Sequence, residues 1–164
     1  MKLLAVDPGV RCCGWALFVV PLAGGPRLLR CGLASAEGDN DLERFSRMAK
    51  QLPPCDMLVV ERPQIYSRRK SKGDPEDLAR LLILCGYIAG STGAAPSTRL
   101  VRPHDWKGTI PKAPINRYIV HRRNVEALGR QYIPDSVPAS LAHNVADAVG
   151  LGVWWLRHKV SYGM

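Results

Sequence analysis

The sequence LLAVDPG, at residues 3–9, decides the fold of this chain. Four apolar residues in a row predict a strand that is buried on both faces, because a half-exposed strand would alternate apolar and polar residues. Asp7 ends the strand, and a carboxylate carried into a protein interior needs either a cationic partner or a proton. Pro8 and Gly9 then stop the strand pairing and turn the chain. One such Asp most often caps a turn, but two similar signatures follow downstream.

The rest of the chain is predicted to add short strands and helices to this first strand. Short connections join it to the next two strands, which favours an antiparallel meander. Leu42, Phe45 and Ala49 are predicted to share the apolar face of the first helix, and residues 78–88 are apolar almost all round and therefore expected to be buried. Further strands are predicted at residues 14–20, 27–35, 57–61 and 98–103, and helices at residues 39–51, 74–89, 115–128 and 141–156.

A second apolar run, MLVVE at residues 57–61, also ends in a carboxylate, Glu61. A helical crossover separates this run from the meander, so its strand is expected to lie beside the first strand and parallel to it. That arrangement would bring Glu61 close to Asp7. Glu61 could instead pair with Arg62 at the strand end, and such surface ion pairs are common and weak.

A third carboxylate, Asp147, interrupts the apolar helix predicted at residues 141–156, for which Ser140 is a candidate N-cap. Asn144 and His143 lie one turn earlier on the same side of this helix. Two glycines follow Asp147 and would let the helix approach a sheet closely. A lone Asp on an apolar helix is more often a core polar group with satisfied hydrogen bonds than a ligand.

The chain is strongly basic: Lys and Arg total 23 against 14 Asp and Glu, the formal charge is +9, and the isoelectric point is near 9.7. Such a charge favours a polyanionic partner, nucleic acid ahead of a membrane surface, although a merely soluble basic surface would give the same balance. Trp106 lies within the most basic block, residues 99–130, and basic residues interleaved with an aromatic suit a surface that follows a nucleic-acid strand. The candidate nucleic-acid contacts are Tyr66, Arg68, Arg69, Lys70, Lys72, Lys107, Lys112 and Arg117.

Length and cysteine content set further bounds. At 164 residues the chain is long enough for one domain with its own core. Its five cysteines are odd in number and form no Cys-x-x-Cys pair, which indicates reduced thiols of a cytoplasmic protein and neither a zinc site nor a disulfide framework. No apolar stretch reaches the roughly 18 residues of a membrane span, and the N-terminal residues show no signal peptide.

If the three carboxylates converge, their like charges repel one another, and burial strengthens the repulsion. Raised pKa values or bound divalent cations would relieve it. Ligands that are all oxygen, with neither Cys nor several His, favour Mg²⁺ or Mn²⁺ over Zn²⁺. Two such ions about 3.5–4 Å apart activate the attacking water and stabilise the leaving oxygen in phosphodiester hydrolysis. A basic protein with such a site is most simply a nuclease.

Three ordered motifs, LLAVDPGxxxxGW, LVVERP and HNxxDA, begin at residues 3, 58 and 143. Together they resemble the RuvC family of Holliday-junction resolvases within the ribonuclease H-like superfamily. The resemblance covers nearly the whole chain and implies one nuclease domain, residues 1–164, of the α/β class. It implies a mixed sheet of three antiparallel and two parallel strands flanked by helices. It also implies a homodimeric crossover junction endodeoxyribonuclease in the cytoplasm of a bacterial cell, which nicks opposed strands of a four-way DNA junction and leaves 5′-phosphates.

By that resemblance Asp7 would bridge two metal ions, Mg²⁺ with Mn²⁺ as a substitute, while Glu61 and Asp147 would each complete one metal site. Family members commonly have a fourth acid one turn before the last Asp, where this chain has Asn144 with His143 beside it. An amide oxygen is a weaker ligand than a carboxylate, whereas an imidazole would bind Mn²⁺ better than Mg²⁺ and could orient a water. Which of the two residues faces the metal stays open in the sequence, and both join the candidate catalytic set.

The segment PHDWKG at residues 103–108, followed by Pro111 and Lys112, resembles the family segment that carries functionally needed lysines. The likeness is greatest to phage-encoded members. Lys107 and Lys112 are therefore expected to contact phosphate or to stabilise the transition state.

Three other functions are compatible with parts of this pattern. The fold does not fix the substrate, so a ribonuclease H-like nuclease that cuts other branched DNA or an RNA–DNA hybrid is one alternative. A catalytically silent junction-binding protein is another, because Asn144 stands where an acid is common. A sugar-kinase-type phosphotransferase has a related sheet with an early Asp, but this chain has no glycine-rich phosphate loop of that kind.

Overall fold

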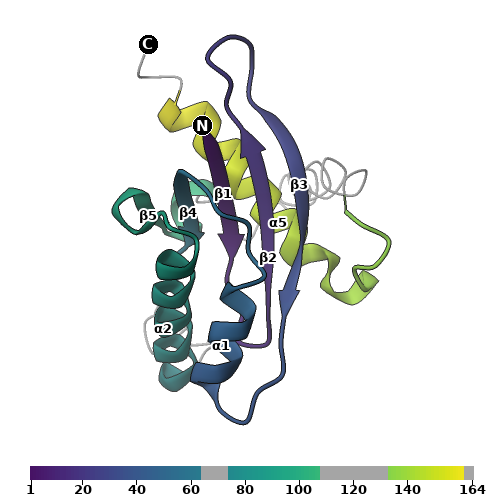
Figure 1. Cartoon of the computed structure of the whole chain (residues 1–164), viewed down its shortest axis with the longest axis vertical. Coiled ribbons are helices and arrows are strands. Elements are labelled where there is room, and N and C mark those ends of the chain that lie inside the picture. The colour runs from purple at the N-terminus through teal and green to yellow at the C-terminus, as the bar shows by residue number, and fades with distance from the viewer. Residues whose placement is uncertain (64–73, 108–132, 161–164) are drawn as a thin grey trace, which may run out of the picture.

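The computed structural model of the chain describes residues 1–63, 74–107 and 133–160. Its centre is a mixed five-stranded sheet (Figure 1). The strands are β1 (Lys2–Asp7), β2 (Cys12–Val19), β3 (Arg27–Ser35), β4 (Met57–Glu61) and β5 (Thr98–Val101), in the order β3-β2-β1-β4-β5. The pairs β1–β2 and β2–β3 are antiparallel, and the pairs β1–β4 and β4–β5 are parallel. The predicted meander and the predicted parallel neighbour of the first strand are therefore confirmed.

Strand β1 is the central strand and is buried on both faces, as its unbroken apolar run predicts. The side chains of Leu3, Leu4, Ala5 and Val6 are all fully buried. Because successive residues of a strand point to opposite faces, Leu4 and Val6 belong to one apolar cluster, and Leu3 and Ala5 belong to a second cluster on the other face.

Helices cover both faces of the sheet (Figure 1). Helices α1 and α2 pack onto the face that carries Leu4 and Val6, and α3 and α5 pack onto the opposite face. No helix within the described residues is long and apolar enough to cross a membrane. The helices are α1 (Asp41–Ala49), α2 (Pro75–Ser91), α3 (Pro103–Lys107) and α5 (Ala142–Trp155), with short turns at η1 (Ala95–Ser97), η2 (Ala139–Leu141) and η3 (Leu156–Val160).

Two predicted burial patterns are wrong. Leu82 and Ile83 of α2 are each 47 % exposed, because α2 packs only one side against α1 and the sheet while its other side faces solvent. In α1, Leu42 is 53 % exposed, and Met48 is buried beside Phe45 in its place. Apolar composition alone therefore overestimates the burial of both helices.

The predicted N-cap of the last helix is also wrong. Ser140 lies inside the short turn η2, and α5 starts after Leu141 with no side-chain hydrogen bond at that cap. The backbone N–H of Leu141 donates to the carbonyl of Pro138 at 2.9 Å instead. The preceding 3₁₀ turn thus satisfies a backbone N–H that would otherwise need a capping side chain.

Two glycines let α5 lie close against β2: Gly152 of the helix, as the sequence predicts, and Gly14 of the strand, which the sequence analysis did not single out. A Cβ at Gly14 would lie 2.0 Å from the backbone oxygen of Asn144, and a Cβ at Gly152 would lie 2.2 Å from Cε2 of Phe18. Gly14 pairs with Asp7 across the sheet. The close approach therefore places the Asn144 turn of α5 beside the end of β1, where the first carboxylate lies.

All five cysteines lie within the described residues and are thiols. Cys13, Cys31 and Cys85 are buried, and Cys12 and Cys55 are half-buried. This agrees with the prediction of mostly buried, reduced cysteines.

The tight contact at Gly152 predicts opposite effects for two glycine-to-alanine changes in helices. Gly152→Ala should lower the free energy of unfolding by about 1–3 kcal/mol, because the added methyl group overlaps the buried Phe18 ring. Gly86→Ala on α2 is the matched control, since an added Cβ meets nothing within 4 Å there. It should raise stability by about 0.5–1 kcal/mol through helix propensity alone. Urea unfolding of both variants measures the difference, and equal effects would contradict the packing.

Candidate active site

Two of the predicted carboxylates leave the sheet side by side. Strands β1 and β4 are parallel, and Val6 pairs with Val60. Asp7 and Glu61 are the next residues of the two strands and also their last residues. The carboxyl ends of parallel neighbours meet at the same edge of a sheet, so the topology brings both side chains to one place.

Helix α5 brings the third carboxylate to the same edge. Asp147 lies one turn after Asn144, whose backbone packs against Gly14 next to the end of β1. Its neighbours Val145, Ala146 and Ala148 are buried against the sheet, whereas Asp147 itself is half-buried. The convergence of the three acids that the sequence predicts is therefore present in the fold.

The ammonium group of Lys107, from α3, lies between two of these acids. Its Nζ is 3.0 Å from Oδ2 of Asp147, 3.0 Å from Oε2 of Glu61 and 3.2 Å from Oε1 of Glu61. It also lies 4.7 Å from the centre of the Trp106 ring, within the range of a cation–π contact. Glu61 therefore pairs with Lys107 across the fold, so the alternative of a surface pair with Arg62 finds no support.

The pKa values of Asp7 and Lys107 reflect the burial and the concentration of negative charge in this site. Burial and, to a smaller extent, the negative charges of Glu61 and Asp147 together raise the pKa of Asp7 to about 8, although the Lys107 ammonium partly opposes them. Burial alone would lower the pKa of Lys107, but the charges of Glu61, Asp147 and Asp7 outweigh it and hold this pKa above its ordinary value. The ammonium thus stays charged, and Asp7 holds a proton near neutral pH.

The donor set fits a divalent cation in chemistry and charge. Every predicted carboxylate ligand supplies hard oxygen atoms, and the cluster already stabilises one positive group, the Lys107 ammonium. Among residues 1–63, 74–107 and 133–160, no three His, Cys, Asp or Glu side chains are arranged as a metal site. In this structure the Lys107 ammonium contacts the oxygens of Glu61 and Asp147 that a metal ion would use.

The structure separates the two candidates for the fourth ligand position. The Asn144 amide nitrogen donates to Sγ of Cys12 at 3.5 Å, so this side chain points toward β2. His143 is exposed to solvent. The role of either residue as a metal ligand stays a prediction.

Sequence analysis missed the role of one residue in this site. Trp106 is only 6 % exposed and packs in the apolar cluster beneath α5, so it does not belong to an open surface for nucleic acid. Its Nε1–H donates to Oε2 of Glu61 at 2.8 Å. The sequence signal that could have indicated this contact is the position of Trp106 directly before Lys107, because both residues belong to the short helix α3.

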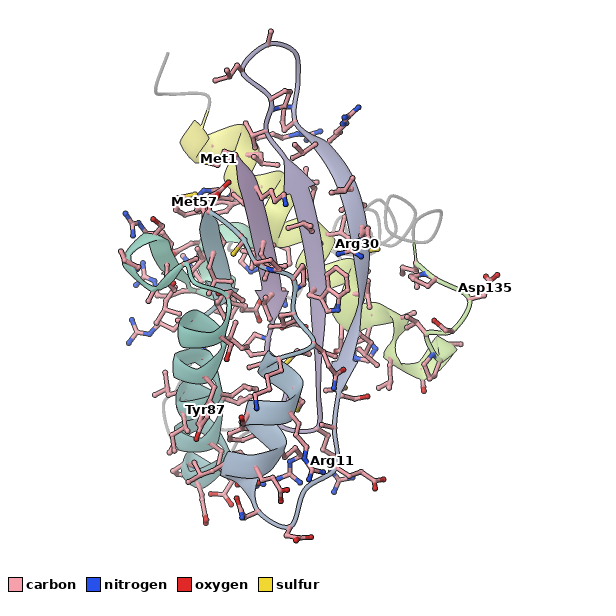
Figure 2. The ribbon with its side chains drawn as sticks, viewed as in Figure 1. Met1, Arg11, Arg30, Met57, Tyr87 and Asp135 are labelled. Atoms are coloured by element: carbon pink, nitrogen blue, oxygen red, sulfur yellow. The ribbon has the colours of Figure 1, made fainter. Side chains whose placement is uncertain are left out.

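Most of the predicted nucleic-acid contacts lie outside the described residues: Tyr66, Arg68, Arg69, Lys70, Lys72, Lys112 and Arg117. Among the described basic residues, Arg11 lies in the turn after β1, and Arg30 lies on β3, an edge strand of the sheet (Figure 2). Lys107 is the described member of the predicted set, and it faces the carboxylates.

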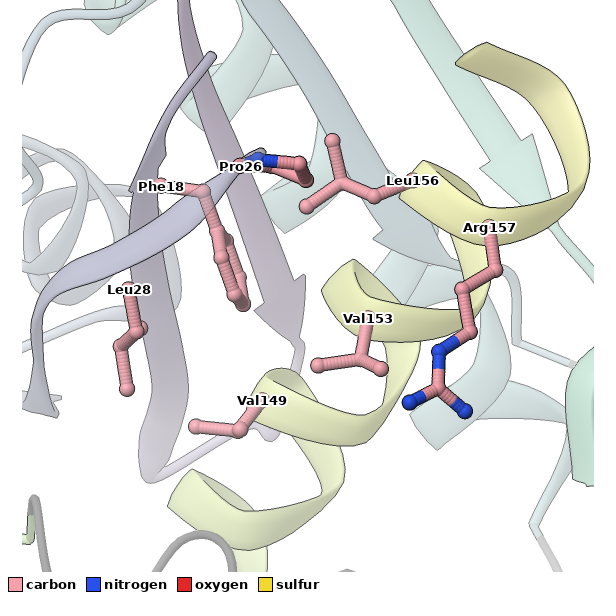
Figure 3. Close-up of a pocket in the computed structure, with 7 residues that line it drawn as sticks. All are labelled: Phe18, Pro26, Leu28, Val149, Val153, Leu156 and Arg157. Atoms are coloured by element: carbon pink, nitrogen blue, oxygen red, sulfur yellow. The ribbon is translucent and has the colours of Figure 1, made fainter. Parts of the chain in front are cut away.

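An apolar cavity of about 240 Å³ lies between α5 and the strands β2 and β3 (Figure 3). Its walls come mainly from Phe18, Leu28, Val149 and Val153, and Arg157 is the charged residue among the described lining. None of the described residues that line the cavity carries a carboxylate, and Val149 and Val153 lie further along α5 than Asp147. Its lining therefore offers no acid–base or metal chemistry.

Solved structures of Holliday junction resolvases share this fold. RuvC of Thermus thermophilus aligns with a TM-score of 0.59 and 16 % identity over 96 % of each chain. The same protein in complex with a Holliday junction substrate gives 0.60 and 14 % over 97 % of each chain. The fowlpox virus resolvase gives 0.57 and 14 % over 96 % of this chain and 98 % of its own. No protein-family model and no curated protein matches the sequence. The predicted ribonuclease H-like fold is confirmed.

The raised pKa of Asp7 predicts that the metal-free protein loses stability as pH rises. The ordinary pKa is 3.8 and the folded value is about 8. At pH values between these two, the unfolded chain ionises Asp7 while the folded chain keeps its proton. The contribution of Asp7 to the free energy of unfolding is therefore fully present below pH 3.8 and is lost as pH rises toward 8. The slope from this one group is at most about 1.4 kcal/mol per pH unit.

Asp7→Asn removes the titrating group and should flatten the profile. Urea unfolding in EDTA, repeated at several pH values between the two pKa values, compares the variant with the parent chain. Parallel profiles for the two proteins would show that Asp7 ionises freely in the folded state.

Proposed function

We propose that this chain is a metal-dependent, structure-selective DNA endonuclease that resolves four-way junctions. The observation that carries the proposal is the convergence of Asp7, Glu61 and Asp147 around the Lys107 ammonium at one edge of the sheet. The names of the fold neighbours, which include RuvC bound to a Holliday junction substrate, support a junction as the substrate. The net charge of +9 supports a polyanionic partner.

In the proposed reaction, Asp7, Glu61 and Asp147 would hold two Mg²⁺ ions, with Mn²⁺ as a substitute and Asn144 as a candidate additional ligand. When bound, the metal ions supply an activated water and charge stabilisation at the scissile phosphate. Asp7 would release its proton to solvent when the added positive charge offsets the repulsion from its two acidic neighbours. Lys107 then leaves the carboxylates and donates hydrogen bonds to a phosphate oxygen, where negative charge develops. His143, exposed on the same helix, is a candidate for orienting water.

Resolution of a junction requires two nicks in opposed strands, so the proposal includes a homodimer with one site in each chain. Each nick would leave a 5′-phosphate. The proposal treats residues 1–164 as one nuclease domain and places the protein in the bacterial cytoplasm. The likeness of residues 103–108 to phage-encoded members stays a prediction.

A silent junction-binding protein is the second candidate. It is favoured because the described acids do not by themselves form a metal site and because Asn144 contacts Cys12. Under this alternative, Lys107 would remain as a permanent counter-ion of Glu61 and Asp147. The two candidates differ in whether bound junction is cut.

A cleavage assay on matched DNA substrates tests the proposal. A labelled four-way junction, a linear duplex, a fork and an RNA–DNA hybrid are each incubated with the protein in Mg²⁺, Mn²⁺ or EDTA. Paired symmetric nicks in the junction alone, lost in EDTA and in Asp7→Asn, are the expected result. Asp7→Asn should still bind the junction, because it removes negative charge near phosphate.

Other outcomes of this assay separate the alternatives. Cutting of the fork or the hybrid in place of the junction would keep the metal chemistry and reject resolution. Tight junction binding without cleavage in either metal would establish the silent binding protein.

Lys107→Met tests the proposed move of the ammonium to phosphate. Methionine keeps the aliphatic stem but removes the charge, so cleavage at saturating metal should fall by about 100-fold. Single-turnover cleavage measures the rate, and circular dichroism checks that the variant is folded. Unchanged cleavage would show that the lysine serves only as a counter-ion of the acids.

A further inference from the structure

Trp106 makes a contact to Glu61 that differs in kind from the contact made by Lys107. The indole Nε1–H donates to Oε2 of Glu61 at 2.8 Å, and the ring is held in the apolar cluster on the α5 face of the sheet. A packed indole ring has two side-chain torsions and no titrating group, so its donor keeps one position at every pH of interest. Glu61 therefore has one fixed neutral donor beside one flexible cationic donor.

The contact is not a by-product of burying a tryptophan, as a second tryptophan shows. Trp155 of α5 lies in the same apolar cluster and is 9 % exposed, against 6 % for Trp106. Its Nε1 is buried without a hydrogen-bond partner in the part of the chain that the structure describes. Within the described residues, this cluster thus holds one indole whose N–H donates to a carboxylate and one whose N–H has no partner.

We propose that Trp106 is a positioning residue for Glu61: its indole N–H fixes the carboxylate in the orientation that binds metal. The inference rests on the proposed function insofar as Glu61 is a metal ligand. Residues that hydrogen-bond a metal ligand hold its oxygen atoms in place and typically change metal affinity by 10–100-fold when they are removed. Because the proposed reaction moves Lys107 from Glu61 to a phosphate oxygen, the Trp106 contact is the one that remains to hold the carboxylate.

Two matched substitutions test this role. Trp106→Phe keeps an aromatic ring in the core and deletes the donor to Glu61. Trp155→Phe makes the same change in the same cluster at a donor that has no partner there. Mn²⁺ binding to the metal-free protein without DNA is followed by the electron paramagnetic resonance signal of free Mn²⁺, and thermal unfolding records the packing loss in each variant.

Trp106→Phe should bind Mn²⁺ about tenfold more weakly than the parent chain, and Trp155→Phe should bind it equally well. Excess Mn²⁺ should restore junction cleavage by Trp106→Phe, because the defect lies in metal affinity. If Trp106→Phe fails to fold, the isosteric replacement Trp106→3-benzothienylalanine, in which sulfur takes the place of the N–H, carries the same test.

Equal Mn²⁺ affinity in the two Phe variants would overturn the positioning role, as would the absence of Mn²⁺ binding by the parent chain. A parent chain that binds Mn²⁺ but cuts no junction would overturn the proposed function alone. The ratio of the Mn²⁺ affinities would then still decide the role of Trp106.

Discussion

The repulsion among three partly buried carboxylates in one place is the constraint on which this structure depends. Asp7 lies at the end of the most deeply buried strand, and Glu61 and Asp147 reach the same edge from β4 and α5. Without a cation such a cluster opposes folding, because burial weakens the screening of like charges. The Lys107 ammonium supplies that cation in the metal-free chain. The cluster can hold together, but it lacks the positive charge that would fully ionise Asp7.

The remainder of the fold supplies the rigidity that this arrangement needs. Strand β1 contributes four fully buried apolar side chains, and two apolar clusters cover the two faces of the sheet. Gly14 allows the backbone of α5 to lie directly against β2, and Gly152 makes room for the Phe18 ring of β2. A bulkier residue at Gly14 would push α5 outward at the turn before Asp147. The position of the third carboxylate thus depends on a residue that has no functional group.

The topology could be predicted well from the sequence because simple local patterns determine which strands become neighbours in the sheet. An unbroken apolar run indicates a central strand, and a helical crossover indicates a parallel neighbour, so the approach of Glu61 to Asp7 followed from local patterns alone. Burial of individual helix faces did not follow, because Leu42 and Leu82 are as apolar as the residues that do face the core. The indole contact of Trp106 depends on how α3 packs beside β4, and no periodicity encodes that geometry.

Two neighbouring residues of α3, Trp106 and Lys107, donate hydrogen bonds to Glu61 in different ways. Trp106 is buried and neutral and holds one carboxylate oxygen from a fixed ring. Lys107 is partly exposed and charged, and its long side chain can exchange the carboxylates for another anion. If both donors to Glu61 were cations, metal binding would have to displace both of them. The Glu61 carboxylate would then lose its orientation at the moment the metal ion binds. One rigid neutral donor beside one mobile cation lets positive charge be exchanged at this site while Glu61 keeps its orientation.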